Sequence, residues 1–174
     1  MAEREYLLKI CIFCYPDRLL SPSLFSYADG GLDPLTKSTT GVNILPKQIT
    51  VVNANIKLIL TDLSTNPVFK VLYPNHIRSA SAVVFAFSKS NHKFFDSAIA
   101  LYHWFKQHIP HPVPTIAFLG LHSDPEIVSQ KDGQALAQEL SVAYFELAAD
   151  DLQTFDAVVR SLFQKVLLHK GESV

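Results

Sequence analysis

The stretch LKICIFCYPDRLLSPSL, residues 8–24, decides how this chain is interpreted. Its first part is a short apolar run with Ile and Phe, which is typical of a buried strand. Pro16 and Asp17 interrupt that run, and Ser21 followed by Pro22 is the pattern of a helix start. Strand, turn and helix in this order are how an α/β domain presents a phosphate-binding loop. The turn itself, however, has the wrong residues for phosphate.

The composition indicates one globular domain without a general attraction to polyanions. The chain has 174 residues, of which 48% are hydrophobic and 18% charged, and a formal net charge of −1. We therefore expect a single domain over 1–174 and no nucleic-acid partner. The sequence shows no signal peptide, no apolar run of about 18 residues and no lipidation motif, so no direct membrane anchor is expected. Cys11 and Cys14 are spaced for opposite faces of a strand, and a cytoplasmic location is expected.

Hydrophobic periodicity predicts strands that alternate with helices. Such alternation favours a mostly parallel sheet covered on both faces, and a hairpin near Asn53 predicts one antiparallel edge strand. Two prolines favour a long loop over 63–75. The expected strands are 6–13, 42–52, 56–62, 82–87, 115–120 and 142–147. One expected helix begins at Ser21 and ends before Gly30, and the others span 94–108, 132–140 and 152–168.

Further segments, taken with this order, carry a family resemblance. They are TTGV at 39–42, KLILTD at 57–62, RSASAVVF at 78–85, PTIAFLG at 114–120, GQALAQEL at 133–140 and YFE at 144–146. With LKICIF at 8–13 they resemble a Ras-superfamily small GTPase, particularly the Rab-like and archaeal Rab-like members, over about 6–168. The resemblance implies a three-layer Ras-like G domain of the P-loop NTPase fold, with a six-stranded, mostly parallel sheet and one antiparallel edge strand.

The family's phosphate loop, G-x-x-x-x-G-K-[ST], falls on residues 14–21. Its glycines let backbone N–H groups turn towards the phosphates, and its lysine reaches them. Here Cys14 and Leu19 stand at the glycine positions, Leu20 stands at the lysine position, and only Ser21 is kept. Losing a charged hydrogen bond to an anion costs on the order of 2–3 kcal/mol. Ser21 is either a magnesium ligand or a helix N-cap, and capping preference favours the cap.

Two more positions correspond to the parts of the family that bind magnesium. Thr39 matches the switch threonine that closes on magnesium and the γ-phosphate, although an ordinary loop threonine is the favoured interpretation. Asp62 matches the acid of the D-x-x-G motif, and it fits a strand-end turn residue equally well. Thr65 replaces the glycine of that motif, and Asn66 replaces the glutamine that orients water. No catalytic residue is therefore expected.

The base-recognition motif, [NT]-K-x-D, appears as Leu121-His122-Ser123-Asp124. Asp124 keeps the acid that would accept two N–H bonds from guanine. Asp124 followed by Pro125 is an equally good helix N-cap with a first-turn proline. Leu121 and His122 replace the asparagine and lysine, and the last motif, S-A-K, reads AAD at 148–150.

These substitutions lead to two functional hypotheses. In the first, the protein is a pseudo-GTPase that binds no cofactor, hydrolyses no GTP and acts through protein–protein interaction. In the second, it is a divergent GTPase that still binds GTP or GDP with magnesium. Under the second hypothesis the nucleotide-binding residues are Ser21 and Asp124, and the magnesium ligands are Ser21, Thr39 and Asp62.

The first hypothesis makes two structural expectations. Tyr15, Leu19 and Leu20 are apolar residues in a loop that normally faces a polar ligand, so they should fold inward or be covered by a partner. The segment 63–75 is either a contact face, used by a protein partner or by a homo- or heterodimer, or an ordered loop that covers the sheet.

Overall fold

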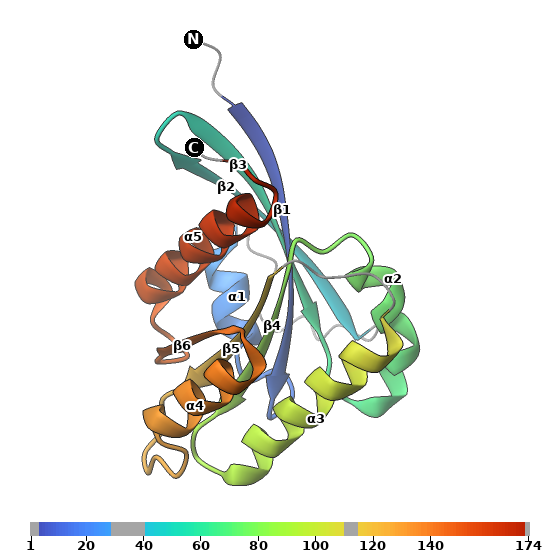
Figure 1. The fold of residues 1–174 in the computed structure, drawn as a ribbon, viewed down its shortest axis with the longest axis vertical. Helices are drawn as coiled ribbons and strands as arrows, with labels where there is room; N and C mark the ends of the chain where they lie inside the picture. The colour runs from blue at the N-terminus through green and yellow to red at the C-terminus, as the bar shows by residue number, and fades with distance from the viewer. Residues whose placement is uncertain (1–3, 29–40, 110–114, 173–174) are drawn as a thin grey trace.

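Strands and helices alternate along the chain in the order that the apolar pattern predicts (Figure 1). The computed structural model describes residues 4–28, 41–109 and 115–172. The strands are β1 (Arg4–Tyr15), β2 (Val42–Val51), β3 (Ala54–Leu63), β4 (Ala82–Ser88), β5 (Thr115–Leu121) and β6 (Ala143–Leu147). The helices are α1 (Ser21–Tyr27), the 3-10 helix η1 (Pro67–Leu72), α2 (Tyr73–Ile77), α3 (His92–His108), α4 (Gln130–Leu140) and α5 (Leu152–His169).

The strands form one sheet in the order β2-β3-β1-β4-β5-β6. β2 runs antiparallel to β3, and the other neighbouring pairs are parallel. Helices α1 and α5 pack on one face of the sheet, and α2 and α3 pack on the other (Figure 1). The expected three-layer fold, with one antiparallel edge strand, is confirmed.

β1 lies near the centre of the sheet and contributes side chains to both cores. Ile10, Ile12 and Cys14 face the side covered by α1 and α5, whereas Cys11 and Phe13 face the side covered by α2 and α3. The two cysteines therefore lie on opposite faces, as their spacing predicts. Both thiols are free and buried, and burial raises the pKa of each to about 12.

The segment expected to be a long loop, 63–75, is largely helical. η1 begins at Pro67, and the Asn66 side chain caps it by accepting a hydrogen bond from the Val68 backbone N–H at 3.2 Å. Pro74 lies in the first turn of α2. The loop interpretation was wrong because both prolines stand at helix starts, where a missing N–H removes no helical hydrogen bond.

The helix after β5 begins later than Asp124 suggests. Asp124 lies in a loop with a cis peptide bond to Pro125, and α4 begins at Gln130 with Ser129 as its N-cap. Ser129 and Asp132 form a reciprocal capping box that satisfies two backbone N–H groups. The N-cap interpretation of Asp124 was therefore wrong. Among the described residues, no helix is both long and apolar enough to cross a bilayer.

Candidate functional site

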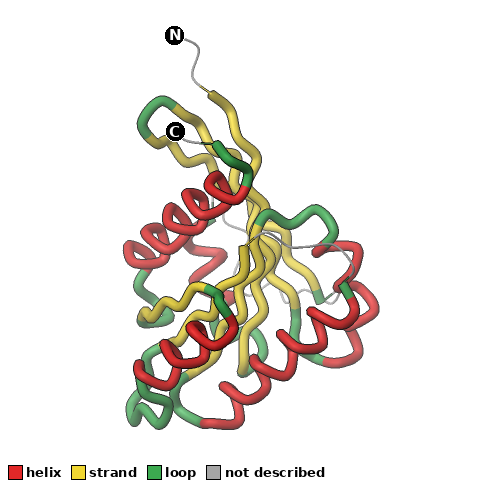
Figure 2. The backbone as a smooth tube through the Cα atoms, in the orientation of Figure 1, coloured by secondary structure: helices red, strands yellow, loops and turns green. Residues whose placement is uncertain are grey.

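The carboxyl ends of the parallel strands meet at one edge of the sheet, and the loops that follow them gather there (Figure 2). The Ser23 hydroxyl on α1 donates a hydrogen bond to the carbonyl of Ala149, after β6. The His122 backbone N–H, after β5, donates to the carbonyl of Leu147 at 2.9 Å. The segments that correspond to the phosphate and base-recognition motifs are thus brought together, as expected for an α/β sheet.

The loop after β1 satisfies its own backbone groups. The N–H of Leu19 donates to the carbonyl of Pro16 at 3.2 Å, and the N–H of Ser21 donates to the carbonyl of Arg18 at 3.2 Å. The Cys14 carbonyl accepts a hydrogen bond from the Thr65 hydroxyl at 3.0 Å. In a phosphate loop such N–H groups face the anion, whereas here two of them are already paired within the loop.

The apolar residues of this loop do not behave alike. Leu20, at the lysine position of the motif, is 1% exposed and belongs to the core under α1 and α5. Tyr15 is half-buried against the opposite core, and Leu19 remains 41% exposed. Inward folding is confirmed for Leu20, whereas Leu19 is not buried, so for Leu19 only cover by a partner remains as a prediction.

Ser21 and Asp62 are brought into direct contact, although they are 41 positions apart. The Ser21 hydroxyl donates to the Asp62 carboxylate at 2.6 Å, and the Asn43 amide donates to the same oxygen at 3.2 Å. Ser21 is the first residue of α1 and not its N-cap, because the cap position is Leu20, which makes no side-chain cap bond. Asp62 lies inside β3 and not in a turn. The favoured interpretation of Ser21 as a helix cap was therefore wrong, as was the alternative interpretation of Asp62 as a turn residue.

Ser21 and Asp62 are two of the three residues expected to bind magnesium under the divergent-GTPase hypothesis. Within the described ranges, no group of three or more His, Cys, Asp or Glu residues could hold a metal ion. Thr39, the third expected ligand, lies outside the described residues. Magnesium is usually held by one or two carboxylates together with substrate phosphates. The described residues therefore do not form a magnesium site by themselves.

Asp17 joins the loop after β1 to the end of β3. Its carboxylate accepts a hydrogen bond from the Ser64 hydroxyl at 2.7 Å and from the Thr65 backbone N–H at 2.9 Å. Thr65 occupies the position of the missing D-x-x-G glycine, and Ser64 immediately precedes it. From the sequence, Asp17 was only a residue that interrupts the first strand, because nothing in its local context identifies partners 47 and 48 positions away.

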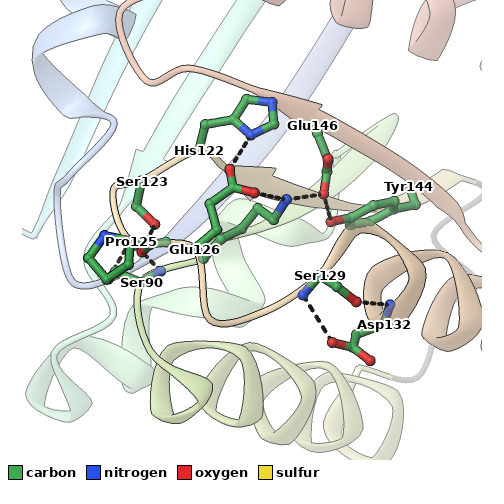
Figure 3. A network of polar contacts seen from close by, with 11 residues as sticks. Ser90, His122, Ser123, Pro125, Glu126, Ser129, Asp132, Tyr144 and Glu146 are labelled. Carbon is green, nitrogen blue, oxygen red and sulfur yellow. Dashed lines mark hydrogen bonds and ion pairs between the residues drawn. The ribbon is translucent and has the colours of Figure 1, made fainter.

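The base-recognition segment has lost its family residues and acquired another polar network (Figure 3). Leu121 is buried at the end of β5, whereas His122 is exposed and its ring contacts the Glu126 carboxylate at 2.5 Å. Asp124 is exposed, and its side chain bonds to none of the described residues. The acid that would contact guanine under the second hypothesis thus belongs to no polar network among the residues that the structure describes.

Lys89 is the residue that sequence reasoning missed. It follows β4 and is 1% exposed, and its ammonium contacts Glu146 at 2.6 Å and Glu126 at 3.0 Å. Burial alone would lower the pKa of Lys89, but the hydrogen bonds and charges of the two carboxylates outweigh it and raise that pKa. The signal in the sequence is a lysine two positions after the apolar run 82–87, with Glu146 on another predicted strand.

Comparison with known proteins decides the family. A model of the Ras family matches residues 21–168, which is most of the chain. This chain belongs to the Ras family. The match begins at Ser21, the one kept residue of the phosphate-loop motif.

The curated relatives of this Ras-family chain are Rab proteins at low identity. It is 25% identical to human "Ras-related protein Rab-3A" over 175 residues, covering 93% of this chain and 76% of that protein. It is 24% identical to "GTP-binding protein ypt2" of Schizosaccharomyces pombe, covering 95% and 84%. It is 23% identical to "Ras-related protein Rab-10" of Caenorhabditis elegans, covering 99% and 88%.

Replacing Asp62 with asparagine should make the protein more stable than the wild type at pH 7. Burial raises the pKa of Asp62, and the hydrogen bonds from Ser21 and Asn43 offset this only in part. The unfolded carboxyl loses its proton at a lower pH than the folded one, so the wild type loses stability as the pH rises between the two pKa values. Urea unfolding from about pH 4 to about pH 7 should show the advantage of Asp62→Asn growing with pH.

Asp96, which is exposed on α3, provides the control for this comparison. Asp96→Asn should change stability little at either pH, because its carboxylate is hydrated in both states. An Asp62→Asn variant that is less stable than the wild type at pH 7 would show that the charged bonds at Asp62 outweigh its burial.

Proposed function

We propose that this Ras-family protein is a pseudo-GTPase that acts through protein–protein interaction, without bound nucleotide and without GTP hydrolysis. The observation that carries the proposal is Leu20, which fills the core at the position where the family motif has its phosphate-binding lysine. A lysine in that motif acts by reaching the phosphates. A buried leucine side chain cannot do so, and Arg18 is the one cation in the loop at 14–20.

The residue at the position of the family's water-orienting glutamine has a structural role. Asn66 stands where the family has its water-orienting glutamine, and its side-chain oxygen accepts the Val68 N–H to cap η1. The Asn66 backbone N–H donates to the Ser64 hydroxyl at 3.2 Å. A residue held in this way supports η1, and we therefore propose that it does not position an attacking water.

The partner would dock on the surface of η1 and the neighbouring edge strand. Val68 and Val71 are 70% and 78% exposed on η1, and Ile44 is exposed on β2. Phe69 and Tyr73 instead pack into the core beneath α2 and α3, so the contact surface consists of the valines and not of the aromatic residues of this segment. We propose a cytoplasmic protein partner or a second copy of the chain as the occupant.

The alternative, a divergent GTPase, is supported by one observation. The Ser21–Asp62 bond of 2.6 Å keeps together a hydroxyl and a carboxylate that could share a magnesium ion with nucleotide phosphates. Binding would then require the loop after β1 to open, because its own carbonyls pair with the N–H groups of Leu19 and Ser21.

A nucleotide-binding experiment distinguishes the two functions. The protein as purified should release no GTP or GDP on denaturation, and 1 mM nucleotide with magnesium should leave the melting temperature unchanged. A ligand with a dissociation constant of 1 μM would instead stabilise the protein by about 4 kcal/mol, which corresponds to a shift of roughly 8–16 °C for a domain of this size.

"GTP-binding protein ypt2" of Schizosaccharomyces pombe, handled in parallel, is the positive control for the nucleotide assay. A magnesium-dependent shift of several degrees in this protein, abolished by Asp62→Ala, would favour the divergent GTPase. Mass measurement of the same sample would show whether the chain forms a dimer.

A further inference from the structure

The Asp17 carboxylate makes two hydrogen bonds to the segment that follows β3, and a loop that had only lost its phosphate-binding residues would not need them. Both carboxylate oxygens are used: one accepts from the Thr65 N–H at 2.9 Å and the other from the Ser64 hydroxyl at 2.7 Å. A backbone N–H and a hydroxyl that converge on two oxygens of one anion form the kind of contact that proteins make with phosphate.

The segment that Asp17 contacts corresponds to a switch. In GTPases, the loops that include this segment are ordered by contacts to the terminal phosphate and magnesium, and are released on hydrolysis. Thr65 stands at the D-x-x-G glycine, so its N–H belongs to that segment. In this chain, the Thr65 N–H donates to the carboxylate of Asp17, which belongs to the altered phosphate loop itself.

The contact continues from Ser64 towards the proposed partner surface. The Ser64 carbonyl accepts a hydrogen bond from the Tyr73 hydroxyl at 2.7 Å, and its N–H donates to the Gly41 carbonyl, just before β2, at 2.9 Å. The Tyr73 ring packs edge-on against Phe13, with ring centroids 4.8 Å apart. Asp17 thus connects to η1, α2 and β2, the elements that flank the exposed valines.

We propose that the Asp17 carboxylate is an internal substitute for the terminal phosphate. It holds the segment Ser64-Thr65-Asn66, and with it η1, in a single conformation that does not depend on nucleotide. This inference rests on the proposed function and adds its regulation: the partner surface is presented permanently, and no hydrolysis step withdraws it.

Hydrogen exchange of the purified full chain tests this inference. Asp17→Ala should increase the exchange rates of the Thr65, Asn66 and Phe69 amides about tenfold, whereas amides in β4 should keep their wild-type rates. Asp17→Asn, which keeps the size and removes the charge, should give a smaller increase in the same amides. Asp96→Ala, an exposed carboxylate on α3, is the matched control and should change none of them.

Two outcomes would overturn the inference while leaving the protein folded. Unchanged exchange at Thr65 and Asn66 in Asp17→Ala would show that the contact does not hold the segment. Wild-type rates in Asp17→Asn would show that the charge is dispensable and that no anion is being replaced. Protection of these amides by GTP and magnesium in the wild type would instead overturn the proposed function, so the two failures are distinguishable.

Discussion

Replacing Lys89 with methionine should lower the free energy of unfolding by about 3–5 kcal/mol, which is the usual loss when one partner of a buried ion pair is removed. Lys89 is almost fully buried, and Glu146, which it contacts at 2.6 Å, has only 11% of its side chain exposed. Methionine fills a similar volume but leaves this carboxylate without its cation. Urea unfolding at pH 7, followed by circular dichroism, measures the loss.

Two comparisons separate the ion pair from other effects of this substitution. Lys93→Met, on the exposed first turn of α3, should change stability by less than about 0.5 kcal/mol. Adding Glu146→Gln and Glu126→Gln to Lys89→Met should recover much of the loss, because the buried Glu146 charge and its exposed neighbour Glu126 are then removed together with the lysine. A single variant within about 1 kcal/mol of the wild type would show that Glu146 is better hydrated than its exposure indicates.

Shortening Leu20 to alanine should lower the free energy of unfolding by about 2–5 kcal/mol, as for other buried leucines. The side chain is buried in the core beneath α1 and α5, so alanine would leave a cavity next to Leu24 and the sheet. This result is informative because a lysine in a phosphate loop reaches a ligand and contributes little to a core. Chemical unfolding, with the slope checked against the wild type, is the measurement.

Leu19→Ala is the matched control, because Leu19 is adjacent in sequence but 41% exposed. Its effect should stay within about 0.5 kcal/mol. Equal effects at Leu19 and Leu20 would contradict the assignment of Leu20 to the core. A loss confined to Leu20 would support the view that the former phosphate-binding loop has become part of the folded interior.

The order of strands and helices could be predicted because it depends on local composition. Apolar runs such as 82–87 are buried on both faces of a parallel sheet, and α3 and α5 show the period of a helix that packs on one side. The predicted cysteine geometry was also confirmed, since side-chain direction in a strand alternates with a period of two. The helical segment at 67–77 was missed because its prolines were interpreted as loop residues.

The roles of single polar residues could not be predicted in this way. Ser21 was assigned to a helix cap by local preference, but its hydroxyl bonds to Asp62 on a strand that pairs with β1. Lys89 was given no role from the sequence, yet the pairing of β4 with β5 and β5 with β6 places it between two carboxylates. Such partners are set by strand register and packing, which local propensity does not encode.

By itself, the amino-acid sequence determined the sheet, the longer helices that cover it and the absence of the glycines and lysine from the phosphate loop, because each of these depends on neighbouring residues. Only the tertiary structure decided what replaced them. The folded chain buries Leu20 and directs Asp17 to the N–H of Thr65. Both facts depend on how loops from distant strands meet at one edge of the sheet, where long-range packing selects each side chain's partner.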